Sequence, residues 1–109
     1  MSIDQWNERT TVLITATFKD EAGTLTTPTS ATARIDDDRT GTVLRAATAI
    51  TPLSTSVTIE VTPDENRILD DQSSWEDRTL TVDFVYGETS RRGTNDYHWR
   101  CMNLRGVVS

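Results

Sequence analysis

Cysteine is nearly absent from the sequence: Cys101 is the only one, so the chain can form no disulfide within itself. A small domain without such cross-links is typical of a reducing compartment or of a larger assembly. No apolar run approaches the roughly 20 residues that a transmembrane helix needs. The first residues also lack the basic start and apolar stretch of a signal peptide. We therefore expect a protein made and kept in the cytoplasm of its producing cell, with no membrane partner.

Positive charge is scarce as well. The 109 residues have a formal net charge of −6 and a pI near 4.6. A protein that binds along phosphates needs a basic surface, so the composition predicts no nucleic-acid partner. Lys19 is the only lysine, and the other cationic residues are arginines. Arginine forms bidentate contacts and is enriched at protein interfaces, which favours protein partners.

Histidine and cysteine, which serve many catalytic and metal sites, occur once each, whereas Asp and Glu together number 17. His98 is the only histidine, and on an expected strand it faces away from its neighbours Tyr97 and Trp99. One histidine and one cysteine cannot supply the four ligands of a zinc site. The five glycines are scattered singly and form no phosphate-binding loop. The sequence therefore predicts a protein that is not an enzyme and has no cofactor and no metal ion.

One acidic cluster leaves a metal alternative open. Asp36-Asp37-Asp38-Arg39-Thr40-Gly41 resembles the start of an EF-hand loop, but Ala47 stands where that loop needs a bidentate glutamate. We interpret this segment as the solvated tip of a hairpin. A looser calcium site shared with another loop is the alternative.

Period-two alternation of apolar residues is the dominant local pattern. Residues 9–18 place apolar side chains on one face and threonines on the other, as expected of a strand with one buried side. The same alternation predicts strands over 31–36, 42–49, 56–61, 77–86 and 94–104. The expected inward residues are Val12, Ile14, Ala16, Phe18, Ala31, Ala33, Ile35, Val57, Ile59, Val61, Leu80, Val82, Phe84, Tyr86, Tyr97, Trp99 and Cys101.

The segment Thr62-Pro63-Asp64-Glu65 has the pattern of a capping box: a hydroxyl at the N-cap, proline next and glutamate three residues after the cap. It predicts a short helical turn over residues 63–69. Six or seven strands with this one short turn predict an all-β fold. The specific fold that we expect is an immunoglobulin-like antiparallel β-sandwich without the Cys pair of antibody domains. A small antiparallel barrel is the alternative.

We expect one sandwich domain over residues 9–104, an N-terminal arm over 1–8 and a C-terminal tail over 105–109. The arm carries two apolar residues, Ile3 and Trp6. A tryptophan there either folds back on its own domain or anchors in a pocket of a neighbouring protein.

The end of the chain is basic, although the chain as a whole is acidic. Residues 91–109 carry four arginines against a single carboxylate, Asp96. This asymmetry suits docking on a complementary protein surface, and a chance distribution of surface charge is the alternative. We predict partner-binding roles for Ile3, Trp6, Arg91, Arg92, Arg100 and Arg105.

Three stretches carry a family resemblance: residues 57–71 (VTIEVTPDENRILDD), 76–82 (EDRTLTV) and 103–107 (NLRGV). With the opening 14–20 (ITATFKD), they resemble small immunoglobulin-like virion structural proteins of tailed bacteriophages. The resemblance implies a capsid decoration (cement) protein or a head–tail neck (connector) component. Such a protein binds capsid, neck or tail subunits in multiple copies and is assembled into the virion in the host bacterial cytoplasm. The family supplies no site residues that transfer to this chain.

A different class of function remains as the alternative. An adhesion or carbohydrate-binding module of the β-sandwich type would present Trp75 or Trp99 as a stacking platform beside the acidic loops.

Overall fold

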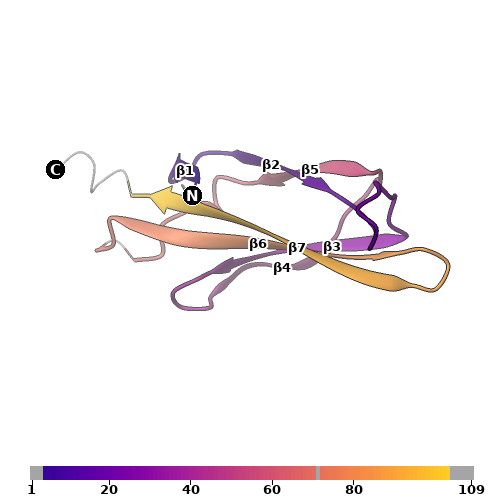
Figure 1. Ribbon diagram of the computed structural model, residues 1–109. Coiled ribbons are helices and arrows are strands. Elements are labelled where there is room, and N and C mark those ends of the chain that lie inside the picture. Colours follow the sequence, from indigo (N-terminus) through magenta and orange to yellow (C-terminus); the bar gives the residue numbers. More distant parts are fainter. Residues whose placement is uncertain (1–3, 71, 104–109) are drawn as a thin grey trace.

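The structure, a computed structural model, describes residues 4–70 and 72–103. Within those residues the chain forms seven strands and no helix (Figure 1). The predicted all-β class is confirmed, and each predicted strand has a counterpart. The described part accordingly contains no helix that could cross a membrane. The strands are β1 (Asp4–Asn7), β2 (Val12–Thr17), β3 (Ser30–Asp37), β4 (Val43–Ala49), β5 (Ser56–Val61), β6 (Trp75–Tyr86) and β7 (Arg91–Met102).

These strands form two sheets, a five-stranded sheet in the order β1-β7-β6-β3-β4 and a two-stranded sheet of β2 and β5. β1 runs parallel to β7, with Asp4 opposite Trp99, whereas the other paired strands are antiparallel. The expectation of a wholly antiparallel fold is therefore wrong at β1. This strand lies in the predicted N-terminal arm, and its four residues show no apolar alternation from which pairing could be predicted.

The two sheets pack against each other around one hydrophobic core (Figure 1). Phe18, just after β2, meets Phe84 of β6 edge-on, with ring centroids 5.0 Å apart. The predicted inward faces are confirmed: Ile14, Val57 and Tyr97 are partly buried at the core margin, and the others are buried. His98 is exposed on the opposite face of β7, as predicted.

The predicted helical turn over 63–69 is wrong, although its capping hydrogen bonds form. Thr62 N donates to Glu65 Oε1 at 2.9 Å, and Glu65 N donates to Thr62 Oγ1 at 3.3 Å. One helix-like backbone bond follows, from Asn66 N to Thr62 O at 3.0 Å. The chain then leaves the helical path, and residues 67–70 and 72–74 form no regular element.

Groups from distant parts of the fold bind the backbone amides and the carbonyl that a helix would use for its own hydrogen bonds. Leu69 N and Asp70 N donate to the two carboxylate oxygens of Glu76 at 2.7 and 3.0 Å. Neither amide is then free to bond the carbonyl four residues back. The Asn66 carbonyl accepts instead from Arg9 N at 2.6 Å. Tertiary hydrogen bonds therefore override a correct start signal.

Glu65 also joins the two sheets through Arg45 of β4. Arg45 donates to both carboxylate oxygens, at 2.6 and 2.5 Å, and its Nη2 reaches Glu60 O of β5 at 2.7 Å. Burial raises the pKa of the Glu65 carboxyl, but the hydrogen bonds from Arg45 and Thr62 favour the carboxylate more strongly. The net result is a pKa below the ordinary value of 4.5.

A pH-dependent contribution to stability follows from this lowered pKa. Stability from Glu65 is present above the unfolded-state pKa and is lost as the pH falls through the folded-state pKa. We expect Glu65→Gln to lower the free energy of unfolding by about 2 kcal/mol at neutral pH and by progressively less in acid. Urea unfolding over a pH series measures this difference. Glu60→Gln, which removes an exposed carboxylate from β5, is the control, and a Glu65→Gln effect that is constant with pH would contradict the assignment.

Candidate functional site

The β3–β4 hairpin, the loop between β5 and β6 and the start of β6 meet at one end of the molecule (Figure 1). A buried ionic cluster joins these segments. Arg78 of β6 is fully buried. Its Nη1 donates to Asp37 Oδ1 at 2.8 Å, and its Nη2 donates to Glu76 Oε1 at 2.8 Å and to Arg67 O at 2.6 Å. A buried charge is costly unless it is paired and hydrogen-bonded. This arginine therefore ties three segments together.

The carboxylates of the cluster in turn order the loops around them. Asp37 Oδ2 accepts from Thr40 N at 3.0 Å and from Thr40 Oγ1 at 2.8 Å, which closes the tip of the β3–β4 hairpin. Glu76 accepts the two loop amides of Leu69 and Asp70 described above. Both walls of the site are thus attached to the same buried arginine.

Sequence analysis missed this cluster, although a signal for it was present. Glu76 and Arg78 have the same parity as Leu80 and therefore point inward on β6. Asp37 has the same parity as Ile35 on β3. A pair of opposite charges on the inward side of an alternating strand indicates a buried ion pair, because neither charge could stay there alone. The interpretation of residues 36–41 as a solvated tip is wrong for Asp37, which is 2% exposed.

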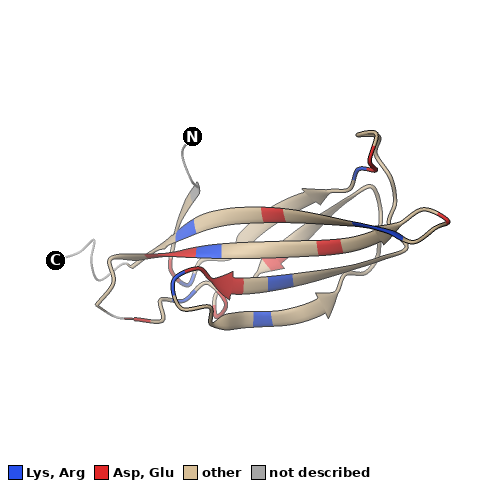
Figure 2. Ribbon diagram, turned by 60° about the horizontal axis from the view of Figure 1, so that its bottom comes forward, with Lys and Arg blue, Asp and Glu red and all other residues tan. Residues whose placement is uncertain are grey.

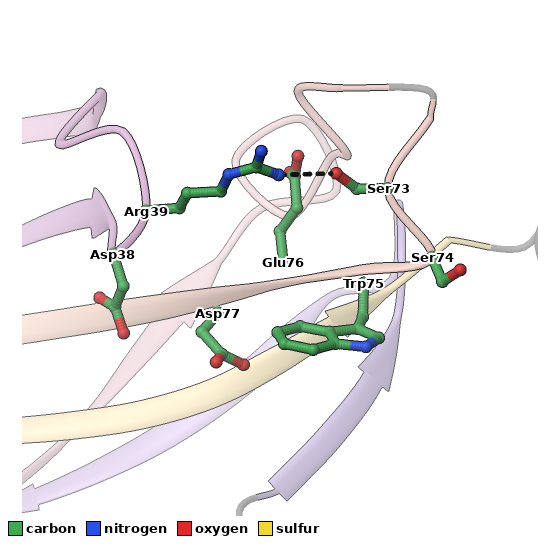
Figure 3. Close-up of a pocket in the computed structure, with 7 residues that line it drawn as sticks. All are labelled: Asp38, Arg39, Ser73, Ser74, Trp75, Glu76 and Asp77. Atoms are coloured by element: carbon green, nitrogen blue, oxygen red, sulfur yellow. Dashed lines mark hydrogen bonds between the residues drawn. The ribbon is translucent and has the colours of Figure 1, made fainter.

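A surface hollow of about 500 Å³ lies next to the ionic cluster, and we call it the Trp75 pocket (Figure 3). Trp75 itself is 45% exposed. In Figure 3 the Arg39 side chain extends above the Trp75 ring toward Ser73, and its Nη1 donates to Ser73 Oγ at 3.4 Å. The pocket is lined by Asp38, Arg39, Ser73, Ser74, Trp75, Glu76 and Asp77.

Arg100 of β7 holds the Trp75 ring in place. Its guanidinium carbon lies 3.7 Å from the ring centroid, and its Nε donates to Asp77 Oδ1 at 3.0 Å. A cation over an aromatic face is attracted by the ring, and the ion pair fixes the guanidinium in that position. Arg100, one of the predicted partner-binding residues, thus positions the Trp75 ring by stacking on it, although it is not itself part of the pocket lining.

A hydrogen-bonded chain of Asp38, Thr79 and His98 crosses the exposed face of the five-stranded sheet. Thr79 Oγ1 lies 2.5 Å from Asp38 Oδ1 and 2.9 Å from His98 Nδ1. An ionised carboxylate only accepts, so the Thr79 hydroxyl donates to Asp38 and accepts the Nδ1–H of His98. A hydroxyl nucleophile needs the reverse, with the imidazole accepting its proton. This chain orders the exposed face and does not activate Thr79.

The three consecutive aspartates diverge from one another. Asp36 pairs with Arg34 at 2.9 Å, Asp37 with buried Arg78 and Asp38 with Thr79. Within the described residues, no three His, Cys, Asp or Glu side chains lie close enough together to hold a metal ion. This segment therefore supplies no set of ligands for the calcium site that was the alternative.

The predicted partner-binding residues do not form one patch. Arg91 and Arg92 begin β7, and Arg100 lies nine residues further along, about 30 Å away at the strand rise. Arg91 contacts the Glu21 carboxylate, which also accepts from Tyr86 Oη at 2.9 Å. Figure 2 shows acidic and basic positions interspersed along the strands of the five-stranded sheet.

The apolar candidates differ from one another in placement. Trp6 lies on β1 opposite Cys101 and is 39% exposed. Trp99 is buried, and its Nε1 donates to Asn66 Oδ1 at 3.1 Å, so it cannot serve as a stacking platform. Cys101 is buried too, and desolvation raises the pKa of its thiol to about 11, which suits a core side chain. Ile3 and Arg105 lie outside the described residues.

A comparison of the chain with protein-family models, curated proteins and solved structures returns no match.

The buried cluster predicts an asymmetry between two arginine variants. Arg78→Met leaves the buried carboxylates of Asp37 and Glu76 without their cation, and we expect a loss of about 3–5 kcal/mol in the free energy of unfolding. Arg34→Met removes an exposed pair with Asp36 and should cost under about 1 kcal/mol. Urea unfolding of both variants measures the difference, and equal losses would contradict a structural role for the buried cluster.

Proposed function

We propose that this chain is a non-enzymatic structural protein of a tailed-bacteriophage virion, which binds neighbouring virion subunits as a capsid decoration protein or a head–tail neck component. It would be assembled in the host bacterial cytoplasm and present in multiple copies, so that individually weak contacts add up through avidity. The Trp75 pocket is the observation that carries the binding role.

The sheet order supports an immunoglobulin-like version of the all-β fold. In variable-type immunoglobulin domains, strands G, F, C and C′ are neighbours in one sheet, and B and E lie in the other. The order β7-β6-β3-β4 and the pair β2-β5 correspond to this arrangement. The chain departs from antibody domains in two ways, because it has no Cys pair and its buried tryptophan, Trp99, lies on β7.

The chemistry of the Trp75 pocket supports binding to a protein. Tryptophan and arginine dominate the energetics of protein interfaces, and Trp75 is presented beside Arg39 and over Arg100. The pocket is built on β6 and on loops attached to buried Arg78, so little order has to be gained on binding. The Asp38–Thr79–His98 chain, in which the hydroxyl donates to the carboxylate, supports a role without catalysis.

Removal of the Trp75 side chain tests this proposal. We expect Trp75→Ala to weaken co-sedimentation of the full chain with capsid or neck subunits by at least about 30-fold, as for a central interface tryptophan. Arg91→Glu combined with Arg92→Glu tests whether the distant end of β7 also contributes. Thr58→Ala, on the exposed side of β5, is the control. Wild-type binding by Trp75→Ala would exclude the pocket as the contact, and no binding by the wild type to any virion subunit would exclude the virion role.

The carbohydrate-binding alternative retains one observation in its favour, the exposed ring of Trp75 beside Asp38 and Asp77. A glycan array separates the two functions. Strong hits that disappear in Trp75→Ala would favour sugar stacking over subunit binding.

A further inference from the structure

One face of the five-stranded sheet packs on the core, and the other is exposed along β3, β6 and β7 (Figure 2). We call the outward side chains of residues 30–36, 79–85 and 92–98 the β6 face, because β6 runs along its middle. Each of these outward side chains is exposed or half-buried. A hollow of about 350 Å³ lies over the end of the face that carries Val85. The face is therefore accessible to another protein surface.

Charges of opposite sign lie on the two sides of β6. The registers place Arg34 of β3 and Asp96 of β7 in one row, on either side of Thr81. The next row has Asp36 on the β3 side and His98 on the β7 side. In the row of Thr81, the β3 flank is therefore positive and the β7 flank is negative.

The charged groups of this row have binding capacity left. Arg34 contacts Asp36 through its Nε, which lies 2.9 and 3.0 Å from the two carboxylate oxygens, so neither Nη group takes part in that pair. The Asp96 carboxylate forms no hydrogen bond or ion pair with any residue that the structure describes. A guanidinium with free Nη groups and an unpaired carboxylate are suited to each other, because such pairs form charge-assisted hydrogen bonds.

A half-turn about the long axis of β6 exchanges the two flanks of the face. When two copies meet across such an axis, Arg34 of each copy faces Asp96 of the other, so both contacts form together. Asp36 likewise faces His98. In the two rows nearer the β6–β7 turn, Arg92 is the only charged residue on the flanking strands. Like charges therefore do not meet on these strands.

One pair of like charges lies on the axis itself, where Asp83 faces its own copy. Thr94 Oγ1 donates to Asp83 Oδ1 at 2.8 Å, which draws each carboxylate toward its own β7. Since the half-turn places the two β7 strands on opposite sides, the two carboxylates lean apart. A two-fold axis across the strands at the row of Thr81 would instead place Arg34 over Arg34 and Asp96 over Asp96. The charges therefore favour the axis along β6.

We propose that the β6 face binds the β6 face of a second copy of this chain in a two-fold symmetric dimer, with the axis along β6 and reciprocal contacts between Arg34 and Asp96. The face extends about 23 Å along the strands and about 15 Å across them, which is small for a permanent interface. The dimer is therefore weak, and it gains strength where many copies are held close together. This self-association goes beyond the proposed virion role and does not depend on it.

Sedimentation velocity of the purified full chain over a concentration series tests the proposal. We expect monomers and dimers with no larger species, because a two-fold contact is closed. Arg34→Asp and Asp96→Arg should each weaken the dimer at least about tenfold, and the two together should restore it, since both pairs re-form with reversed signs. Arg67→Asp, which breaks an exposed pair with Asp64 outside the face, is the control and should leave the dimer unchanged.

Cross-linking identifies the axis. The axis places Thr81 opposite its own copy, and sheets packed face to face lie about 10 Å apart. A bismaleimide that spans this distance should link Thr81→Cys to itself and leave Thr58→Cys, on the exposed side of β5, unlinked. Cys101 is buried and the pKa of its thiol is raised, so it supplies no reactive background.

Three results would overturn the proposal. The first is a chain that stays monomeric at about 1 mM, where even a weak interface associates. The second is a dimer that Arg34→Asp and Asp96→Arg leave intact, or that the double variant fails to restore. The third is equal cross-linking of Thr81→Cys and Thr58→Cys, which would show that a different surface forms the contact.

Discussion

The structure depends above all on the charge of Arg78, which is buried without access to water. Its guanidinium binds carboxylates from two strands, Asp37 and Glu76, and the carbonyl of Arg67 in the loop before β6. The buried cation requires these three contacts, because they replace part of its lost hydration, while its Nε has no hydrogen-bond partner among the described residues. The requirement fixes the hairpin and the loop relative to β6. It also redirects the loop amides that would otherwise continue a helix.

The buried cluster also orders the surface that lies above it. Trp75 begins the strand that carries Glu76 and Arg78, and Arg39 extends from the hairpin that Asp37 closes. The side chains of the pocket therefore come from backbone segments that the buried cluster already fixes. The stacked guanidinium of Arg100 also restricts the motion of the Trp75 ring. Aromatic and arginine side chains that are ordered before binding favour association with a partner, since little conformational entropy remains to be lost.

The open edges of the two sheets differ in how regular their strands are. Bulges in β4 and the Arg45 contact on β5 leave one side of the molecule poorly suited to strand addition. The opposite side, between β2 and β7, keeps regular backbone and exposed apolar side chains.

Much of the fold could be predicted from the sequence, and the site only in part. Alternation placed Val82 and Phe84 in the core and His98 outside, and Trp75 was recognised as a candidate platform. The buried role of Asp37 was missed because an acidic run before a glycine is typical of a solvated turn, and its cation lies 41 residues away. The helical turn was wrong for a similar reason: Thr62 and Glu65 form the local hydrogen bonds of a cap, but Glu76 supplies the competing ones.

The sequence by itself determined which face is buried in the alternating strands β2, β3, β5, β6 and β7, because side-chain direction in a strand depends only on position along the local backbone. Tertiary structure alone decided which strands became neighbours, that β1 joined β7 in parallel, and that the 62–74 loop bound Glu76 instead of forming a helix. These outcomes depend on groups brought together from distant parts of the chain. The energies of such contacts exist only once the chain has folded, and no local pattern encodes them.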